Sequence, residues 1–428
     1  MQFGVITLPN SEKKILIYFV LLMVLTEDFM ISVFHIPSFI RYINDGVVMY
    51  LFLNCLLNFY DFVTRVKQTQ TSGILITLSV FLLYVVVNVL INQVPALLFL
   101  WASRNVLRFP VFFLCCSYYL ERDDFERIFS FLYKFQWLNL AICLYQYLIK
   151  GYQGDYLGGI FGINKGCNIS MNMFLIIISA YCVLLYIERK QSLTKTFFVL
   201  GEVILIAALA ELKIIYFELA LLIVLMFVLT SEYKRILYLM LISSIALFIG
   251  LLILKVVNPY HFNILTDIDM LLSYSFEKNG AYHLTRFRAF SNINNIFFKG
   301  NIIRNLFGYG FGNCEYSNYS FLTSSFYKRF GHYNYRWFSH QMFFLEIGYI
   351  GFILYCTILV SIIYCAFKQK NAYLWIRMSI IMSVLILMNL FYDSSARVEI
   401  SYLTFFVLSG VTACNKGTLS VKKYENMS

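Results

Sequence analysis

Two stretches in the second half of the chain decide how it is organised, and they read RFRAFSNINNIFFKGNIIRNLFGYGFGN (286–313) and RWFSHQMFFLEIGYIGF (336–352). The first lies in a long polar interval and contains a glycine-rich turn. Its glycines are Gly308, Gly310 and Gly312. The second runs into an apolar segment, with His340 just before it and Glu346 inside it. A histidine and several arginines at a membrane surface favour chemistry on an anionic lipid. A structured loop with snorkelling arginines is the alternative.

The composition is that of a membrane protein. Hydrophobic residues make up 60% of the chain and charged residues only 13%, whereas soluble domains carry about 25% charged residues. The apolar runs are long and do not alternate, which favours helices over a β-barrel. The net charge of +11 lies between these runs, so we assign it to topology and lipid headgroups and expect no nucleic acid. The ten cysteines lack zinc-type spacing, and we predict neither metal nor cofactor.

We predict an all-α polytopic membrane protein with about twelve transmembrane helices. The predicted spans are 14–34, 46–63, 73–92, 95–119, 128–149, 169–187, 196–212, 214–230, 236–257, 340–367, 375–392 and 398–414. They divide the chain into three parts. These are an N-terminal transmembrane bundle (1–257), a large external loop (258–339), and a C-terminal bundle with a short tail (340–428).

Basic residues predict the orientation of the chain. Lysine and arginine gather in alternate loops, for example at Arg65 and Lys67 and again at Arg189 and Lys190. The positive-inside rule places these loops and both termini in the cytoplasm. The interval 258–339 then becomes external. It is basic as well, but long loops translocate largely regardless of their charge.

The external loop carries two apolar patterns. Phe290, Ile293, Ile296 and Phe297 recur at helical spacing, which predicts a short amphipathic helix lying at the membrane interface. Within 316–338, aromatic residues alternate with serine, asparagine and arginine. Aromatic rings stack on sugar faces and also form belts at membrane interfaces, so this stretch fits either role.

Charges inside the predicted spans are informative because each costs about 2.5–3.5 kcal/mol to insert. Arg104 and Arg108 lie four residues apart and should share one helix face. They need an anionic partner, either a lipid diphosphate or nearby carboxylates. Lys213 lies between Glu211 and Glu218, so an internal ion pair is the alternative to substrate binding.

His340 stands near the start of the helix that follows the loop. This position fits a general base that deprotonates an acceptor hydroxyl. The alternative is an interfacial histidine that hydrogen-bonds the backbone of the loop.

Four stretches, taken in order, resemble the O-antigen polymerase and ligase family. They are GGIFGINKGCNISMNMF (158–174), ALAELKIIYFELALLI (208–223), LFGYGFGN (306–313) and SHQMFFLEIGYIGFILY (339–355). They look like the family's Gly-x-Phe-x-x-x-Asn stretch, its basic residue before an apolar helix, its glycine turn and its loop-to-helix histidine motif. About twelve spans with a large external loop late in the chain also match this family.

The resemblance implies a metal-independent glycosyltransferase of the bacterial inner membrane that polymerises polyprenyl-diphosphate-linked oligosaccharide repeat units for O-antigen, capsule or exopolysaccharide. Lys213 takes the place of the family's membrane-border basic residue, Arg286 or Arg288 that of the arginine that contacts the diphosphate, and His340 that of the motif histidine. Gln341 stands where the family often has asparagine, and lysine stands at 213 where it often has arginine. Implied partners are membrane lipids, a chain-length regulator and a flippase.

Three other functions fit the sequence. An O-antigen ligase would move the finished glycan to lipid A core or to protein. A glycosyltransferase using polyprenyl-phosphate sugars would need an acidic pair, as at Glu27 and Asp28 or at Asp267 and Asp269. A lipid-linked oligosaccharide flippase would suit the spans and buried arginines, although the hydropathy lacks the paired halves typical of transporters.

Overall fold

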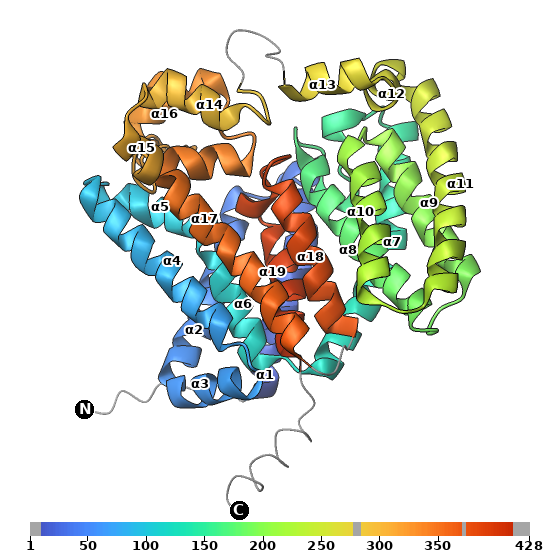
Figure 1. The fold of residues 1–428 in the computed structure, drawn as a ribbon, viewed down its shortest axis with the longest axis horizontal. Coiled ribbons are helices and arrows are strands. Elements are labelled where there is room, and N and C mark those ends of the chain that lie inside the picture. Colours follow the sequence, from blue (N-terminus) through green and yellow to red (C-terminus); the bar gives the residue numbers. More distant parts are fainter. Residues whose placement is uncertain (1–9, 277–283, 370–373, 414–428) are drawn as a thin grey trace, which may run out of the picture.

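The computed structural model describes residues 10–276, 284–369 and 374–413. The fold is 80% helical, and no strand occurs within those ranges. Figure 1 shows long helices side by side, with a group of short helices at one end. The outermost residues of both termini, which we predict to be cytoplasmic, lie outside the described ranges.

Most of the α-helices of the bundle come from the first 257 residues. They are α1 (Asn10–Val33), α2 (Arg41–Leu57), α3 (Phe59–Gln68), α4 (Ser72–Ile91), α5 (Ala96–Val106), α6 (Arg108–Tyr119), α7 (Arg122–Leu148), α8 (Cys167–Ile187), α9 (Leu193–Leu209), α10 (Lys213–Leu229) and α11 (Tyr233–Val257). The chain closes with α17 (Ser339–Lys368), α18 (Leu374–Asn389) and α19 (Ser401–Leu408).

Helices occupy the positions of the predicted spans, but the structure supports a smaller number of crossings. Among the described residues, seven helices are long and apolar enough to cross a membrane, or eight if α5 and α6 form one bent span. α18 is a shorter apolar helix, and so is α19 with the turn that follows it. The all-α membrane class is therefore supported, and the number of twelve spans stays a prediction.

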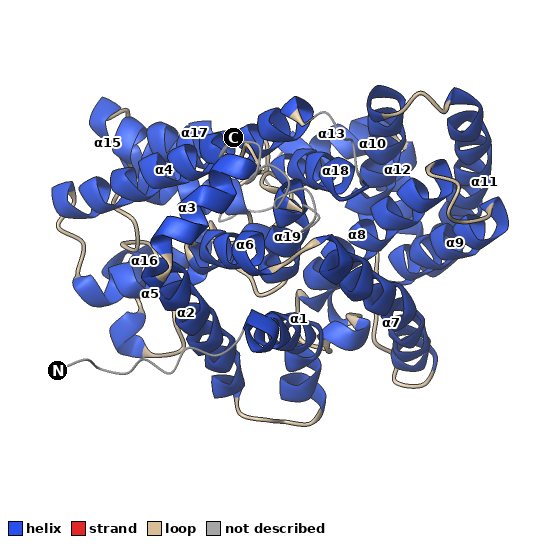
Figure 2. Cartoon of the chain, turned by 90° about the horizontal axis from the view of Figure 1, so that it is seen from below, coloured by secondary structure: helices blue, strands red, loops and turns tan. Residues whose placement is uncertain are grey.

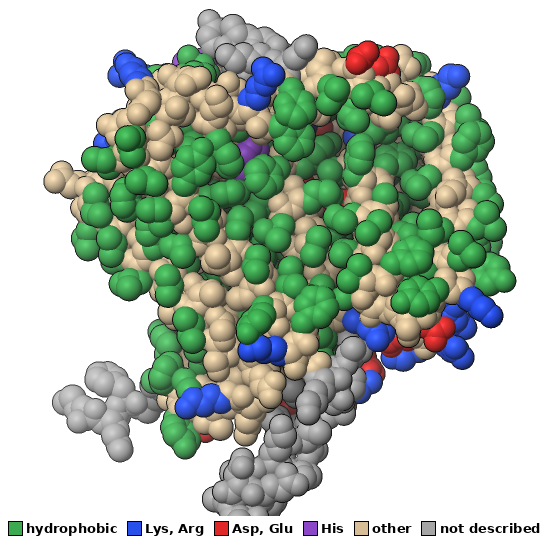
Figure 3. Space-filling model, in the orientation of Figure 1, with side chains coloured by type: hydrophobic (Ala, Val, Ile, Leu, Met, Phe, Trp, Pro, Cys, Tyr) green, Lys and Arg blue, Asp and Glu red, His purple; other side chains and the backbone are tan. Residues whose placement is uncertain are grey.

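The surface agrees with a membrane-embedded body. Figure 3 shows apolar side chains across the middle of the visible face and lysine or arginine side chains near its upper and lower edges. Large apolar residues such as Ile76, Leu83 and Leu237 are exposed on the long helices. Exposed leucine and isoleucine in this number are stable in lipid and costly in water.

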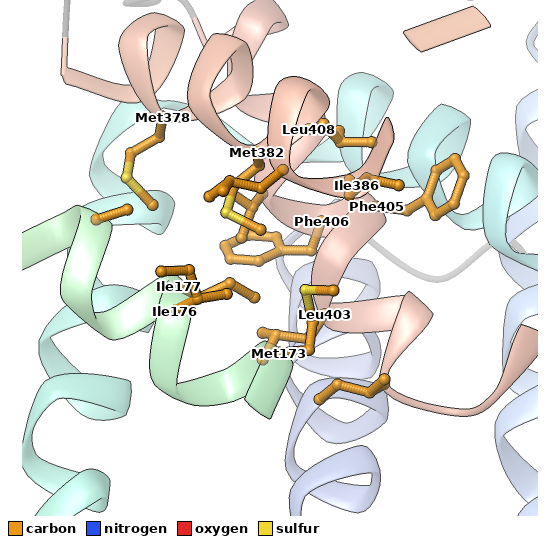
Figure 4. Packing of buried hydrophobic residues seen from close by; sticks show 14 of the residues in the cluster. Met173, Ile176, Ile177, Met378, Met382, Ile386, Leu403, Phe405, Phe406 and Leu408 are labelled. Carbon is orange, nitrogen blue, oxygen red and sulfur yellow. The ribbon is translucent and has the colours of Figure 1, made fainter. Parts of the chain in front are cut away.

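Helix α8 forms the centre of the bundle. It is apolar on all sides and 89% buried along its most apolar stretch, so the other helices pack around it. In Figure 4, Met173 and Ile176 of α8 lie against Met382 of α18 and Phe406 of α19. This contact ties the first and last parts of the chain into one core.

Helices α5 and α6 are not the continuous span that the sequence predicts, because they bend by 49° at Leu107. Pro110 lies just inside α6, and its ring clashes with the carbonyl of the residue four positions earlier, which is Val106. Arg104 and Arg108 thus lie on opposite sides of a break. Both side chains nevertheless reach the same partners, Asp45 and Glu399, so they point to one side of the bent pair of helices.

The predicted loop forms a cap of short helices at one end of the bundle (Figure 1). Their bounds are α12 (Pro259–Thr266), α13 (Ile268–Phe276), α14 (Ala289–Ile293), α15 (Ile302–Phe307) and α16 (Ser325–Phe330). Figure 2, which turns the molecule by 90°, shows α12 beside the α9–α11 group and α15 beside α4 and α17. The cap therefore bridges both sides of the bundle.

The expected amphipathic helix of the loop is short, and its apolar face packs against protein. α14 runs into a π-helical turn, and Ile293 and Phe297 are buried within the cap. Phe297 packs against rings of the 316–338 stretch, including Phe326 and Tyr335. The aromatic stretch thus supplies a protein partner for this apolar face, and the position of the helix at a membrane interface stays a prediction.

Candidate functional site

Two pockets contain four of the predicted site residues, which are Lys213, Arg286, Arg104 and Arg108. We call the first the apolar pocket; it lies between α10, α12, α13 and α18 and has a volume of about 410 Å³. Its lining residues are Lys213, Ile214, Phe217, Ile264, Leu265, Leu271, Leu272, Tyr274, Ser275, Phe276, Arg286, Phe287, Met388, Phe391 and Tyr392. Several rim residues, among them Phe217 and Leu272, are exposed. The pocket is thus open on a side covered by apolar side chains.

Lys213 and Arg286 meet at one tyrosine in this pocket, although they are far apart in the sequence. The Lys213 ammonium donates to the Tyr274 hydroxyl at 3.5 Å, and the Arg286 guanidinium donates to the same oxygen at 3.3 Å. Arg286 also lies over the rings of Phe338 and Tyr392, at 4.8 and 4.6 Å from their centroids. The aromatic rings hold both cations in place without neutralising them.

Within the described ranges, no carboxylate forms an ion pair with either cation. Neither Lys213 nor Arg286 forms an ion pair with a described residue, and the buried Nε of Arg286 has no hydrogen-bond partner there. The nearby Glu211 binds His261 instead, at 3.1 Å. Burial alone would raise the pKa of Tyr274, but the charges of Arg286 and Lys213 lower it below its ordinary value. The pocket is therefore prepared for an anion.

The predicted motif histidine, His340, contacts the backbone of Arg286. His340 is buried, with Nε2 lying 2.8 Å from the Arg286 carbonyl oxygen and Nδ1 lying 3.0 Å from that of Leu390. The next residue, Gln341, donates to the Thr285 carbonyl at 3.2 Å. Both ring nitrogens of His340 are thus engaged with backbone. The geometry agrees with the alternative role, a histidine that hydrogen-bonds the loop.

Arg288 lies apart from its neighbour in the motif. It is exposed at the start of α14 and lines neither pocket, whereas Arg286 is half-buried in the apolar pocket. The sequence resemblance assigned the diphosphate contact to either arginine. In the structure only Arg286 lies together with Lys213.

The second pocket, which we call the arginine pocket, contains Arg104 and Arg108 and has a volume of about 390 Å³. Its lining residues are Ser38, Arg41, Tyr42, Trp101, Arg104, Asn105, Arg108, Glu315, Tyr316, Ser317, Asn318, Tyr319, Arg336, Ser394, Arg397, Val398 and Glu399. They come from α2, α5 and α6, from the cap and from the 394–399 segment before α19.

Carboxylates neutralise the two predicted arginines of this pocket. Arg104 binds Asp45 at 2.7 Å, and Arg108 binds Asp45 at 2.8 Å and Glu399 at 2.9 Å. Arg397 likewise pairs with Glu315. Of the two anionic partners considered for Arg104 and Arg108, the structure supplies the carboxylates. These arginines are therefore not free cations awaiting a diphosphate.

The glycine turn has a structural role, and its glycines line neither pocket. α17 breaks at Gly348, where φ is +62°, and the turn around Gly308 packs into the break. A Cβ at Gly308 would lie 2.4 Å from the Glu346 carbonyl, and one at Gly348 would lie 2.4 Å from that of Leu306. Only glycine at both positions lets the two backbones approach so closely.

The other members of the turn bind the same break in α17. The Gly310 amide donates to the Glu346 carbonyl at 2.9 Å. The Glu346 carboxylate accepts hydrogen bonds from the Gly312 and Cys314 amides, both at 3.1 Å. Gly308, Gly310, Gly312 and Glu346 thus form one structural latch, which joins the cap to α17 and orients the loop that carries Glu315.

The acidic pairs that would suit other chemistries have local structural partners. Asp28 pairs with Arg41 at 2.5 Å, and Glu27 accepts a hydrogen bond from Asn44 at 2.9 Å. Asp267 caps α13 by accepting from the Asp269 amide at 2.9 Å. No group of three or more metal-ligating side chains with suitable geometry occurs in the described ranges.

Sequence reasoning missed several residues of these pockets. Tyr274 and Tyr392 hold the cation pair, and Asp45 and Glu399 neutralise the arginines. The tyrosines carry no pattern that separates them from an interfacial aromatic belt. Asp45 and Glu399 did carry a signal, because a carboxylate at the end of an apolar run needs a cation nearby.

No protein-family model matches the chain, and no curated protein matches it at a significant level.

Proposed function

We propose that the protein is a membrane-embedded glycosyltransferase that polymerises polyprenyl-diphosphate-linked oligosaccharide repeat units. The apolar pocket takes the donor, with the diphosphate on Lys213 and Arg286 and the first isoprene units among the apolar side chains. The single observation that carries this proposal is a pair of cations, held on Tyr274 with no ion pair to a described carboxylate, inside a pocket whose other lining is mostly apolar. The sequence resemblance to O-antigen polymerases agrees with it.

The charge arrangement supports a diphosphate as the ligand. A buried cation without a counter-ion is unfavourable until an anion binds, and a guanidinium binds phosphate oxygens through paired hydrogen bonds. The unpartnered Nε of Arg286 adds a donor to this site. The exposed apolar rim gives a lipid-linked molecule an entry from the bilayer.

The proposed reaction is a single displacement at the anomeric carbon of the donor. The hydroxyl oxygen of an acceptor sugar forms a bond to that carbon, and the bond from the carbon to the diphosphate oxygen breaks. The diphosphate leaves with the electron pair, and the hydroxyl proton passes to water. Arg286 and Lys213 stabilise the negative charge that grows on the leaving group. His340 is a positioning residue here, because it holds the backbone of Arg286.

The test compares two arginines that are two residues apart. In a strain lacking the chain, Arg286→Gln should reduce polymer formation by about 100-fold or more, since removing one donor to a developing oxyanion costs that much. Arg288→Gln is the matched control, and we expect near-normal polymer from it. The measurement is the banding pattern of surface glycan, with membrane levels of each variant checked by immunoblot.

The same gels separate the related functions. Loss of the chain should leave core plus a single repeat if it is a polymerase. Loss of all attached glycan, with lipid-linked polymer accumulating, would instead identify a ligase. An unchanged ladder in the strain lacking the chain would rule out both and favour the flippase. A normal ladder from Arg286→Gln alone would remove the apolar pocket as the donor site.

A further inference from the structure

We propose that the arginine pocket is the acceptor site and binds the sugar residues of a second repeat unit. This inference rests on the proposed function, because it assigns the second substrate of the same reaction. The starting observation is a second pocket, polar and about 390 Å³ in volume, to which the proposed donor site assigns no ligand. Its volume lies within the range of about 300–1,000 Å³ that is usual for small-molecule sites.

The chemistry of the lining matches sugar hydroxyls better than a diphosphate. Ion pairs such as Arg397 with Glu315 and Arg108 with Glu399 present both donors and acceptors at one surface. A hydroxyl group donates and accepts at once, so it can use both kinds of partner. Aromatic side chains complete the lining and offer faces on which sugar rings stack. They are Tyr42, Trp101, Tyr316 and Tyr319.

One guanidinium of this pocket is not neutralised. Arg336 lies over the rings of Tyr316 and Tyr327, at 4.7 and 5.5 Å, and forms no ion pair with a described residue. Its donors are available to sugar oxygens at the wall formed by the cap. This makes Arg336 the residue whose removal should weaken acceptor binding without disturbing an ion pair.

One short segment of the chain contributes to both pockets. Tyr392 lines the apolar pocket, and Ser394, Arg397 and Glu399 line the arginine pocket. The segment 392–399 therefore connects the proposed donor site to the proposed acceptor site. Arg397 pairs with Glu315 of the cap, so this segment is anchored to the loop that carries Glu315.

The arginine pocket is also reached from the membrane side. Tyr42, Trp101, Arg104 and Tyr319 line both this pocket and an open apolar groove of about 340 Å³. The other groove residues are Leu97, Leu100, Phe321 and Leu322. Such an entrance suits an acceptor that is itself carried on a lipid.

The experiment uses the full chain in phospholipid vesicles with lipid-linked repeat units extracted from a strain lacking it. Mild acid releases the free oligosaccharide from part of that extract. This probe has no leaving group, so it can only accept a unit, which yields a soluble dimer. The quantity measured is the oligosaccharide concentration that gives half-maximal dimer formation or half-maximal inhibition of polymer growth.

We expect Arg336→Gln to raise this concentration about tenfold while the requirement for lipid-linked donor stays unchanged, since a charge-assisted hydrogen bond is lost. Arg329→Gln is the matched control, because Arg329 lies on the same loop over Phe330 and lines neither pocket. Tyr319→Ala, at the half-exposed rim of the pocket, should shift the acceptor requirement in the same direction.

The outcomes separate the two proposals. A wild-type chain that makes neither polymer nor dimer would overturn the proposed function itself. Polymer formation that the free oligosaccharide neither joins nor inhibits would overturn only the acceptor site. The same holds if Arg336→Gln and Tyr319→Ala leave the acceptor requirement unchanged, or if they raise the donor requirement instead.

Discussion

The apolar pocket and the arginine pocket both contain arginine beside aromatic rings, yet their charges are arranged in opposite ways. Arg286 and Lys213 share a tyrosine hydroxyl and have no carboxylate partner among the described residues. Arg104 and Arg108 share two carboxylates, Asp45 and Glu399. The first pair is incomplete without an anion, and the second is complete within the protein. Residue type alone therefore does not define a phosphate site; the charge balance around the residue does.

From this comparison we expect the largest loss of stability when an arginine of the arginine pocket is replaced. Arg108→Met should lower the free energy of unfolding by about 3–5 kcal/mol, because it leaves Asp45 and Glu399 with only part of their counter-charge. Thermal unfolding in detergent, together with the amount of chain in the membrane, measures this.

The control for that experiment is Arg286→Met in the apolar pocket. It removes a cation that has no ion pair, so the fold should be retained and only polymer formation lost. Equal destabilisation by the two substitutions would contradict the distinction between a complete and an incomplete charge cluster.

A smaller effect is expected at His340, which connects Arg286 to the end of α18. A neutral imidazole donates to one of the two nearby carbonyls, so His340→Ala leaves one buried carbonyl without its donor, and we expect a loss of about 1–3 kcal/mol in stability. Activity should fall because Arg286 is no longer held in place. The remaining activity should keep the pH profile of the wild type. A changed profile in a variant of unchanged stability would identify His340 as the general base instead.

The sequence predicts the fold class well because composition and apolar length alone determine it. It also singles out Lys213, since a charge in an apolar setting is costly, whereas Arg286 is named, together with Arg288, only by the resemblance. The sequence does not reveal which side chains contact one another in the fold. Nothing local reveals that Asp45 reaches Arg104 or that Tyr274 joins Lys213 to Arg286, because these contacts connect distant segments.

Local pattern is also an incomplete guide in two places. The bend at Leu107, just before Pro110, interrupts a span that the apolar pattern predicts to be continuous, although Arg104 and Arg108 still reach the same carboxylates. The apolar face around Ile293 resembles that of an interfacial helix until the aromatic stretch of the cap covers it. In both cases a tertiary contact or a single proline outweighed the periodicity.

The smallest predicted effect concerns Tyr274 and its dependence on pH. Tyr274→Phe keeps the ring that lies against both cations but removes the shared hydroxyl, so activity at neutral pH should change only about threefold. Because Arg286 and Lys213 lower the pKa of Tyr274 from 10.0, the wild-type hydroxyl ionises at a lower pH than in the unfolded chain. The tyrosinate would then occupy the cations and compete with the diphosphate.

Stability and activity should consequently respond to alkaline pH in opposite directions. A lowered acid pKa adds stability as the pH rises through the folded value, and this contribution is complete above the unfolded value of 10.0. Wild-type activity should fall over the same range, whereas Tyr274→Phe should hold its activity there and gain no such stability. Parallel rate and unfolding measurements across that range would reveal the opposition. Identical alkaline profiles for the wild type and Tyr274→Phe would mean that the diphosphate does not compete for this pair of cations.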